Sequence, residues 1–211
     1  MFFDAYPYVA CPALTGNLTA DVRALLDANG RPKTFEHALA VSEVNAGLAS
    51  RFGLDAAKCR TAGLLHDISA VLTPTDMLAY AQAREFPLCE AELRYNFLLH
   101  QRISRIIAQE HFGVANDDIL SPIECHTTLR VKPAPFDMAL FIADKLAWDQ
   151  EGTPPYYDIV RTALEVSLEK ACLVYMDYMV ESGRLLCPHV NWTAAHDFLR
   201  ARAVQPRQHL L

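Results

Sequence analysis

Two adjacent residues, His66 and Asp67, form a pair that could bind a metal ion at the end of an apolar segment. Successive residues on a helix point about 100° apart, so both side chains can reach one point at the edge of a helix. An imidazole nitrogen beside a carboxylate oxygen is a ligand pair that suits iron, manganese or zinc. The pair therefore predicts a metal-binding point that faces the interior of a helical protein.

Two further residues have the same character. His37 lies one predicted helix upstream, and Asp144 interrupts the apolar run Leu140 to Ala143. A carboxylate in such a helix is costly to bury unless it is paired or bound to a metal. Each residue also has a purely structural interpretation: a helix-end ion pair for His66 and Asp67, a core histidine for His37, and an ion pair with Lys145 or Arg161 for Asp144.

The segments that would position these residues are helical in pattern. Apolar residues recur at helical spacing, and no alternating strand pattern is longer than a few residues. We predict helices over 19–29, 34–52, 55–70, 73–84, 90–112 (broken near Leu99 and His100), 116–127, 135–148, 156–181 and 191–204. Thr19, Asp55 and either Asn191 or Thr193 are the predicted N-caps, and Pro122 either kinks its helix or marks its start. The prediction is an all-α bundle of about eight to ten helices, with residues 1–211 in a single domain.

Composition narrows the class of protein. The 211 residues include 19 Lys and Arg against 25 Asp and Glu, a net charge of −6, and 52% are hydrophobic. This balance predicts a core-forming protein that does not bind nucleic acid, although it leaves a phosphorylated small molecule open. Six scattered cysteines without a CxxC pair predict free thiols of a reducing cytoplasm. The first residues lack a cationic leader, and no apolar run reaches about 20 residues, so no membrane segment is expected.

Five motifs in order resemble the HD-domain metal-dependent phosphohydrolases, and more closely their YqeK branch. They are Phe35-Glu36-His37, Gly63-Leu64-Leu65-His66-Asp67, Leu99-His100, Cys125-His126-Thr127-Thr128 and Phe141-Ile142-Ala143-Asp144-Lys145. The match runs from about Thr34 to Ala171 and implies an all-helical HD core over about 31–182, with N-terminal and C-terminal helical extensions. The branch is associated with symmetrical hydrolysis of diadenosine tetraphosphate to two ADP at a two-iron site.

The resemblance implies a role for each matching residue. His37, His66, Asp67 and Asp144 would hold one ion, and His100 and His126 a second, with Asp67 bridging. It implies two divalent ions, iron first, with Mn, Zn, Ni, Co or Mg as alternatives. Two cations that share a water lower its pKa and produce a hydroxide nucleophile, so Asp67 is also a catalytic candidate. Lys145 is the other catalytic candidate, and the predicted substrate-binding residues are Lys145, Arg161 and Thr127.

Two positions depart from the family pattern: Gln101 stands where glycine is usual, and residues 147–150 replace a Glu-Pro-x-Arg-like stretch. His100 and His126 could instead bind substrate beside a single ion. A one-metal nucleotide phosphomonoesterase and a non-catalytic nucleotide-sensing protein therefore stay open as alternatives. The predicted partner is a nucleotide, and the resemblance also suggests a homodimer. The remaining histidines are expected at the surface or in packing: His111, His189, His196 and His209.

Overall fold

The computed structural model describes residues 2–204, and this part of the chain is all-helical. Its α-helices are α1 (Leu18–Ala28), α2 (Pro32–Phe52), α3 (Ala56–Leu65), α4 (Pro74–Ala83), α5 (Glu90–Arg94), α6 (His100–Glu110), α7 (Asp117–Cys125), α8 (Pro135–Leu146), α9 (Tyr157–Leu164), α10 (Leu168–Glu181) and α11 (Val190–Val204). Short 3-10 helices span Phe2–Ala5, Ile68–Val71 and Asn96–Leu99. The all-α prediction is confirmed, with eleven α-helices in the described residues, slightly above the expected range.

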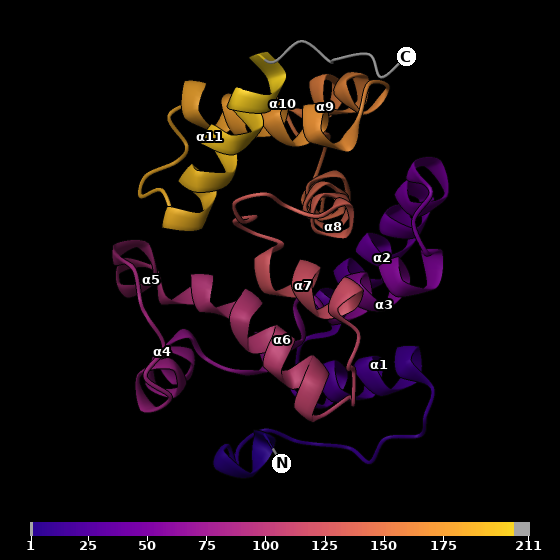
Figure 1. Cartoon of the computed structure of the whole chain (residues 1–211). Helices are drawn as coiled ribbons and strands as arrows, with labels where there is room; N and C mark the ends of the chain where they lie inside the picture. The colour runs from indigo at the N-terminus through magenta and orange to yellow at the C-terminus, as the bar shows by residue number, and fades with distance from the viewer. Residues whose placement is uncertain (1, 205–211) are drawn as a thin grey trace.

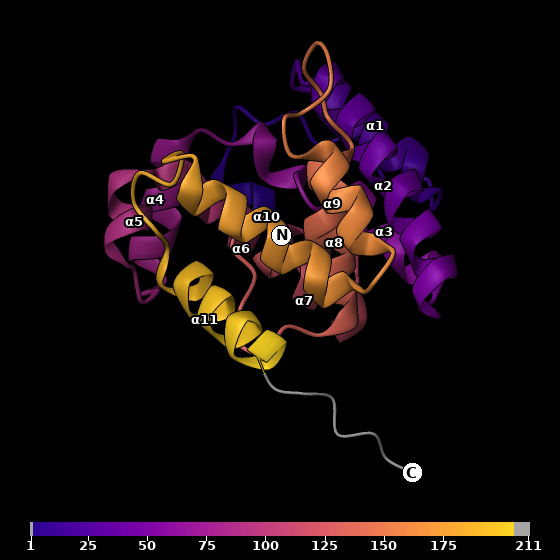
Figure 2. The same ribbon diagram turned by 90° about the horizontal axis from the view of Figure 1, so that it is seen from above.

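Helix α8 lies at the centre of the bundle. It packs against α2, α3, α7 and α10, and Figure 1 shows α9 to α11 above it, α6 and α7 below it, and α2 and α3 to one side. Four successive residues of α8, Leu140 to Ala143, are completely buried. A helix that is apolar on all sides is expected in exactly such an interior position. Seen from above, α10 passes over α8 while α11 lies to one side (Figure 2). Asp144 therefore lies on a helix at the centre of the bundle.

Helices α2 and α3 approach each other very closely at Gly63. A Cβ atom at this position would lie 2.5 Å from the Cα and 2.7 Å from the backbone nitrogen of Ser42 in α2. Only a residue without a side chain allows this approach. The contact sets the end of α3, which carries His66, at a fixed place relative to His37 in α2.

Several element boundaries differ from the sequence prediction for local reasons. Asn17, and not Thr19, caps α1 by accepting a hydrogen bond from the Ala20 nitrogen at 3.1 Å. The predicted helix over 156–181 is wrong as a single element, because Ser167 adopts an extended conformation and caps a new helix, α10. The helix predicted over 55–70 ends at Leu65, so His66 and Asp67 connect α3 to a 3-10 turn. Pro122 lies inside α7, and the predicted Asp55 cap of α3 is present.

The hydrophobic core extends into both terminal regions, since Phe2 and Leu199 belong to the same cluster of buried side chains. The single domain and the core limits of about 31–182 stay predictions. Within residues 2–204 no helix combines the length and the apolarity needed to cross a membrane. His209 lies outside the described residues.

Candidate metal centre

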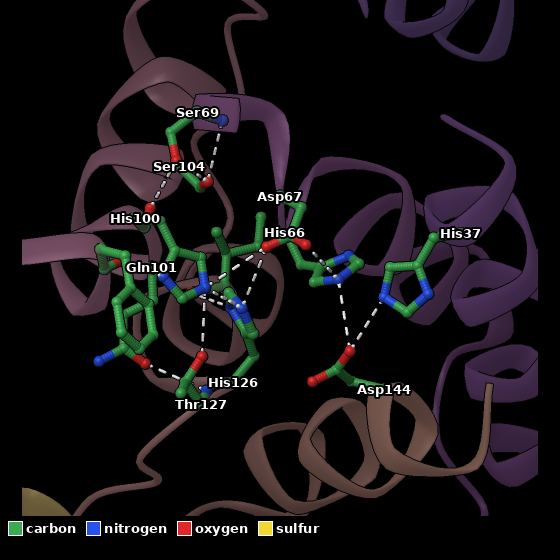
Figure 3. Close-up of polar contacts among 12 residues, drawn as sticks. His37, His66, Asp67, Ser69, His100, Gln101, Ser104, His126, Thr127 and Asp144 are labelled. Carbon is green, nitrogen blue, oxygen red and sulfur yellow. Dashed lines mark hydrogen bonds and ion pairs between the residues drawn. The ribbon is translucent and has the colours of Figure 1, made fainter. Parts of the chain in front are cut away.

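The structure brings the six predicted ligand side chains together around one centre. They come from α2, the end of α3, the start of α6, the end of α7 and the last turn of α8, as Figure 3 shows. We call this group the HD cluster; it consists of His37, His66, Asp67, His100, His126 and Asp144.

One half of the HD cluster surrounds Asp144. Its Oδ1 atom lies 3.1 Å from His37 Nε2 and 3.7 Å from His66 Nε2. The same His66 nitrogen lies 3.5 Å from Asp67 Oδ2. Donor atoms of His37, His66 and Asp67 all lie within 4.8 Å of one another, close enough to hold one ion.

The other half of the HD cluster uses the second oxygen of Asp67. Asp67 Oδ1 lies 3.4 Å from His100 Nε2 and 3.4 Å from His126 Nε2, and these two nitrogens are 2.8 Å apart. The three residues form a second group of donors within 4.8 Å. Asp67 thus presents one oxygen to each half, which is the arrangement that a bridging carboxylate requires.

Three histidines of the HD cluster are oriented by the same local device. Nδ1 of His66, His100 and His126 bonds the carbonyl oxygen three residues earlier, at 2.7, 2.6 and 2.9 Å. All three stand at the end or start of a helical segment, where such carbonyls lack a partner within the helix. A carbonyl only accepts, so Nδ1 carries a proton, and in the neutral imidazole Nε2 presents a lone pair to the centre.

Besides His37 Nδ1, two buried atoms of the HD cluster have no hydrogen bond, namely His66 Nε2 and Asp67 Oδ1. Buried polar atoms are nearly always satisfied, and an exception calls for a missing partner. A cation would satisfy both atoms at once, because His66 Nε2 carries a lone pair in the neutral imidazole and Asp67 Oδ1 is a carboxylate oxygen. The donor set therefore fits a divalent metal ion.

Electrostatics set the protonation states of the metal-free centre. Burial lowers the pKa of His66, but Asp67 and Asp144 outweigh it and raise the value to about 9. In the metal-free chain this histidine is protonated at neutral pH, and a bound ion would replace that proton. Burial lowers the pKa of His126 to about 4, against the pull of Asp67, so this imidazole is neutral. Both carboxyl groups are ionised, because their neighbours outweigh burial and hold each pKa well below its usual range.

The predicted substrate-binding residues occupy different surroundings. The Lys145 ammonium pairs with Asp144 Oδ2 and lies 3.4 Å from the carbonyl oxygen of His126. Despite burial, Asp144 raises the pKa of Lys145. The Thr127 hydroxyl donates to His100 Nε2 at 3.2 Å. Arg161 is exposed on α9, where its guanidinium contacts the Tyr157 hydroxyl at 3.3 Å, and no contact among the described residues joins it to the HD cluster.

Three residues support the centre in roles that the sequence did not predict: Gln101, Ser69 and Ser104. Buried Gln101 accepts a hydrogen bond from the Thr127 nitrogen and donates to the Thr128 hydroxyl, both at 3.1 Å. These two hydrogen bonds hold the segment after His126 against α6, the helix that begins at His100. Ser69 donates to the His100 carbonyl at 3.0 Å and accepts from Ser104 at 3.0 Å. The only signal for these roles in the sequence is that Gln101 and Ser104 are polar and share the inner face of α6.

A cleft of about 430 Å³ opens beside the HD cluster. His37 and Asp67 line its inner end, and Lys33, Thr34, Glu36, Ala40, Ala147, Trp148 and Asp149 line the rest. A volume of this size falls within the range of about 300–1,000 Å³ typical of small-molecule sites. A ligand in this cleft would therefore touch the candidate metal centre directly.

A second cluster of donors lies elsewhere, formed by Cys89, Glu92 and His189. The Asn191 nitrogen donates to His189 Nδ1 at 3.1 Å, so the proton of the neutral imidazole is on Nε2, facing Glu92 at 3.6 Å. Glu92 is also paired with Arg102 at 3.0 Å. These contacts indicate a buried ion-pair network that joins α5 and α6 to the start of α11. His189 is a packing residue, as predicted, and so is His196, which is buried and pairs with Asp177.

Comparison with known proteins agrees with this geometry. A 37% identical region of 122 residues is shared with an uncharacterized protein in the pepC 5' region of Lactococcus lactis, covering 58% of this chain and 63% of that protein. A symmetrical bis(5'-nucleosyl)-tetraphosphatase of Staphylococcus aureus is 30% identical over 61% of this chain and 65% of its own length. The matched region thus spans just under two thirds of these two relatives.

A solved structure is also similar, a predicted HD superfamily hydrolase involved in NAD metabolism from Clostridium acetobutylicum. It superimposes with a TM-score of 0.78 at 27% sequence identity, over 87% of this chain and 97% of that one. The family model of the HD domain matches residues 34–149, which is more than half of the chain and contains all six residues of the HD cluster. The chain therefore belongs to the HD-domain family.

Proposed function

We propose that this protein is a metal-dependent phosphohydrolase that cleaves a nucleotide phosphoanhydride, with diadenosine tetraphosphate as the substrate and two ADP as the products. The observation that carries the proposal is the pair of donor groups that share Asp67 and border a cleft. The name of the Staphylococcus aureus relative supports the choice of substrate and the symmetrical cleavage.

In this proposal the HD cluster holds two divalent ions, iron in the first place. His37, His66, Asp67 and Asp144 would hold one, and Asp67, His100 and His126 the other. When bound, such ions lower the pKa of a water to near neutrality and neutralise phosphate oxygens during bond cleavage. A symmetrical cut adds one water across the central anhydride and divides the four phosphates equally between the products.

The remaining residues would keep this arrangement rigid. Lys145 neutralises Asp144 and steadies the backbone at His126 through the contacts described above. Because the Lys145 ammonium already contacts Asp144 and the His126 carbonyl, a positioning role is favoured over direct contact with phosphate. Thr127 keeps a hydroxyl beside His100, where it could also donate to a phosphate oxygen. The proposed phosphate contact of Arg161 requires α9 to lie near the bound substrate, and substitution of this residue tests it separately.

The test is product identification with anaerobically purified, metal-loaded protein and diadenosine tetraphosphate. We expect ADP as the sole nucleotide product. AMP together with ATP would contradict the symmetrical cut, and phosphate release from AMP would favour the phosphomonoesterase alternative. Asp67→Asn should abolish turnover, whereas Asp197→Asn, an exposed change of the same chemistry on α11, should leave it intact. The homodimer, the absence of nucleic-acid binding and the cytoplasmic location stay predictions.

A further inference from the structure

The outer part of the cleft beside the HD cluster is chemically unlike its inner end. Two exposed carboxylates, Glu36 and Asp149, and one exposed ammonium, Lys33, line it. This excess of negative charge does not attract another phosphate group, whereas carboxylates accept hydrogen bonds from amino and hydroxyl groups. The outer part therefore suits the nucleoside portion of a nucleotide whose phosphates point to the metal centre.

Trp148 supplies an aromatic surface in this outer part. It follows α8 directly, three residues after Lys145, and lines the cleft together with His37 and Asp67. Its side chain is only half-buried, in contrast to Trp192, the other tryptophan of the chain, which is 6% exposed. A half-buried indole that lines a cleft beside a proposed phosphate-binding centre offers a planar surface on which a base can stack.

Packing against buried aromatic side chains holds the Trp148 indole in position. The Trp148 ring meets Tyr156 edge to face, with centroids 6.2 Å apart and an angle of 87° between the planes. Tyr156 is buried, donates a hydrogen bond to the Lys145 carbonyl at 3.3 Å and packs against Tyr175 at 4.9 Å. A platform held in this way loses little conformational freedom when a ligand binds, so more of the stacking energy appears as affinity.

We propose that Trp148 is the base-stacking residue of this cleft, and that Glu36 and Asp149 accept hydrogen bonds from the same nucleoside. The inference rests on the proposed nucleotide phosphohydrolase function and adds the residue that recognises the base. It also gives a role to the segment 147–150, which replaces a Glu-Pro-x-Arg-like stretch of the family pattern.

Tryptophan fluorescence tests the proposal without turnover. In the metal-loaded Trp192→Phe variant Trp148 is the only tryptophan, and with excitation selective for tryptophan we expect saturating ADP to quench its emission. Tripolyphosphate, which has the phosphates but no base, should quench it far less. In Trp148→Phe, where Trp192 is the only tryptophan, ADP should leave the tryptophan emission unchanged. Emission of Trp192→Phe that does not respond to ADP would overturn the proposal.

Kinetics with diadenosine tetraphosphate give a second readout that does not depend on the Trp192→Phe variant folding. Trp148→Ala should raise KM by about 5- to 150-fold, equivalent to about 1–3 kcal/mol of stacking, with kcat within about threefold of the original value. Trp148→Phe keeps an aromatic ring, so its KM should be close to that of the unaltered protein and well below that of Trp148→Ala. An unchanged KM in a turning-over enzyme contradicts the role of Trp148 alone, whereas absence of any nucleotide hydrolysis by the unaltered protein contradicts the proposed function.

Discussion

Replacing Gly63 with alanine would move one half of the metal centre relative to the other. The added Cβ would lie 2.5 Å from the Cα of Ser42, about 1 Å closer than the shortest favourable carbon contact of about 3.5 Å. The obstacle is backbone, which cannot rotate away as a side chain does. Helix α3 must therefore shift from α2 by roughly this distance, and it carries His66 and Asp67 away from His37.

A displacement of about 1 Å in a catalytic arrangement can reduce the rate by about 10²-fold, which corresponds to about 2.7 kcal/mol. We expect Gly63→Ala to lose about this much in kcat/KM and to bind less metal per chain. Overpacking should also lower the free energy of unfolding by about 1–3 kcal/mol. Activity on diadenosine tetraphosphate, metal content and urea unfolding measure the three effects on the same preparation.

Gly47, in the same helix as Ser42, provides the matched control. A Cβ added there meets no atom within 4 Å, so Gly47→Ala should leave activity and metal content unchanged and raise stability by about 0.5–1 kcal/mol. The reasoning would be refuted if folded Gly63→Ala kept the activity and metal content of the unaltered protein. It would also be refuted if Gly47→Ala lost as much as Gly63→Ala.

Three further outcomes follow from the contacts of the centre and its supports. Lys145→Met should lower the free energy of unfolding by about 3–5 kcal/mol in the metal-free protein. The loss should be smaller in the metal-loaded protein, because an ion would also compensate the charge of Asp144, and calorimetry of both forms measures the difference. Gln101→Ala should lower the free energy of unfolding by about 1–3 kcal/mol and weaken binding of the second ion, measured by urea titration and metal titration, whereas exposed Gln109→Ala should do neither. Although burial opposes it, His189, the Cys89 nitrogen and Arg102 hold the pKa of Glu92 at about 2, so its contribution is complete above the unfolded value and is lost as pH falls. Acid titrations of stability should show about 3 kcal/mol of this loss between about pH 4.5 and 2, absent in Glu92→Gln but retained in exposed Glu90→Gln.

The sequence was informative about the centre because ligand residues interrupt apolar helices. His66, Asp67 and Asp144 stand where a core side chain would be expected, and the structure brings all three to one point. Helical periodicity likewise predicted the all-α fold, since each helix must bury an apolar face. Both signals are local, and a single sequence displays them directly.

Other features depend on contacts between distant segments and left little local signal. The break at Ser167 is a capping choice within a continuous helical pattern, and periodicity alone does not distinguish one long helix from two. The hydrogen bonds of Gln101 become visible only when α6 and the end of α7 are adjacent. For Lys145 the sequence left an ion pair with Asp144 and a phosphate contact both open, and the structure shows the ion pair.

The most direct test of the account is the metal content of anaerobically purified protein compared with its His100→Ala variant. His100 belongs only to the donor group that contains Asp67 and His126. We predict two ions per chain in the unaltered protein and one in the variant. A single ion in the unaltered protein, or two ions retained after His100→Ala, would contradict the assignment of two metal sites that share Asp67.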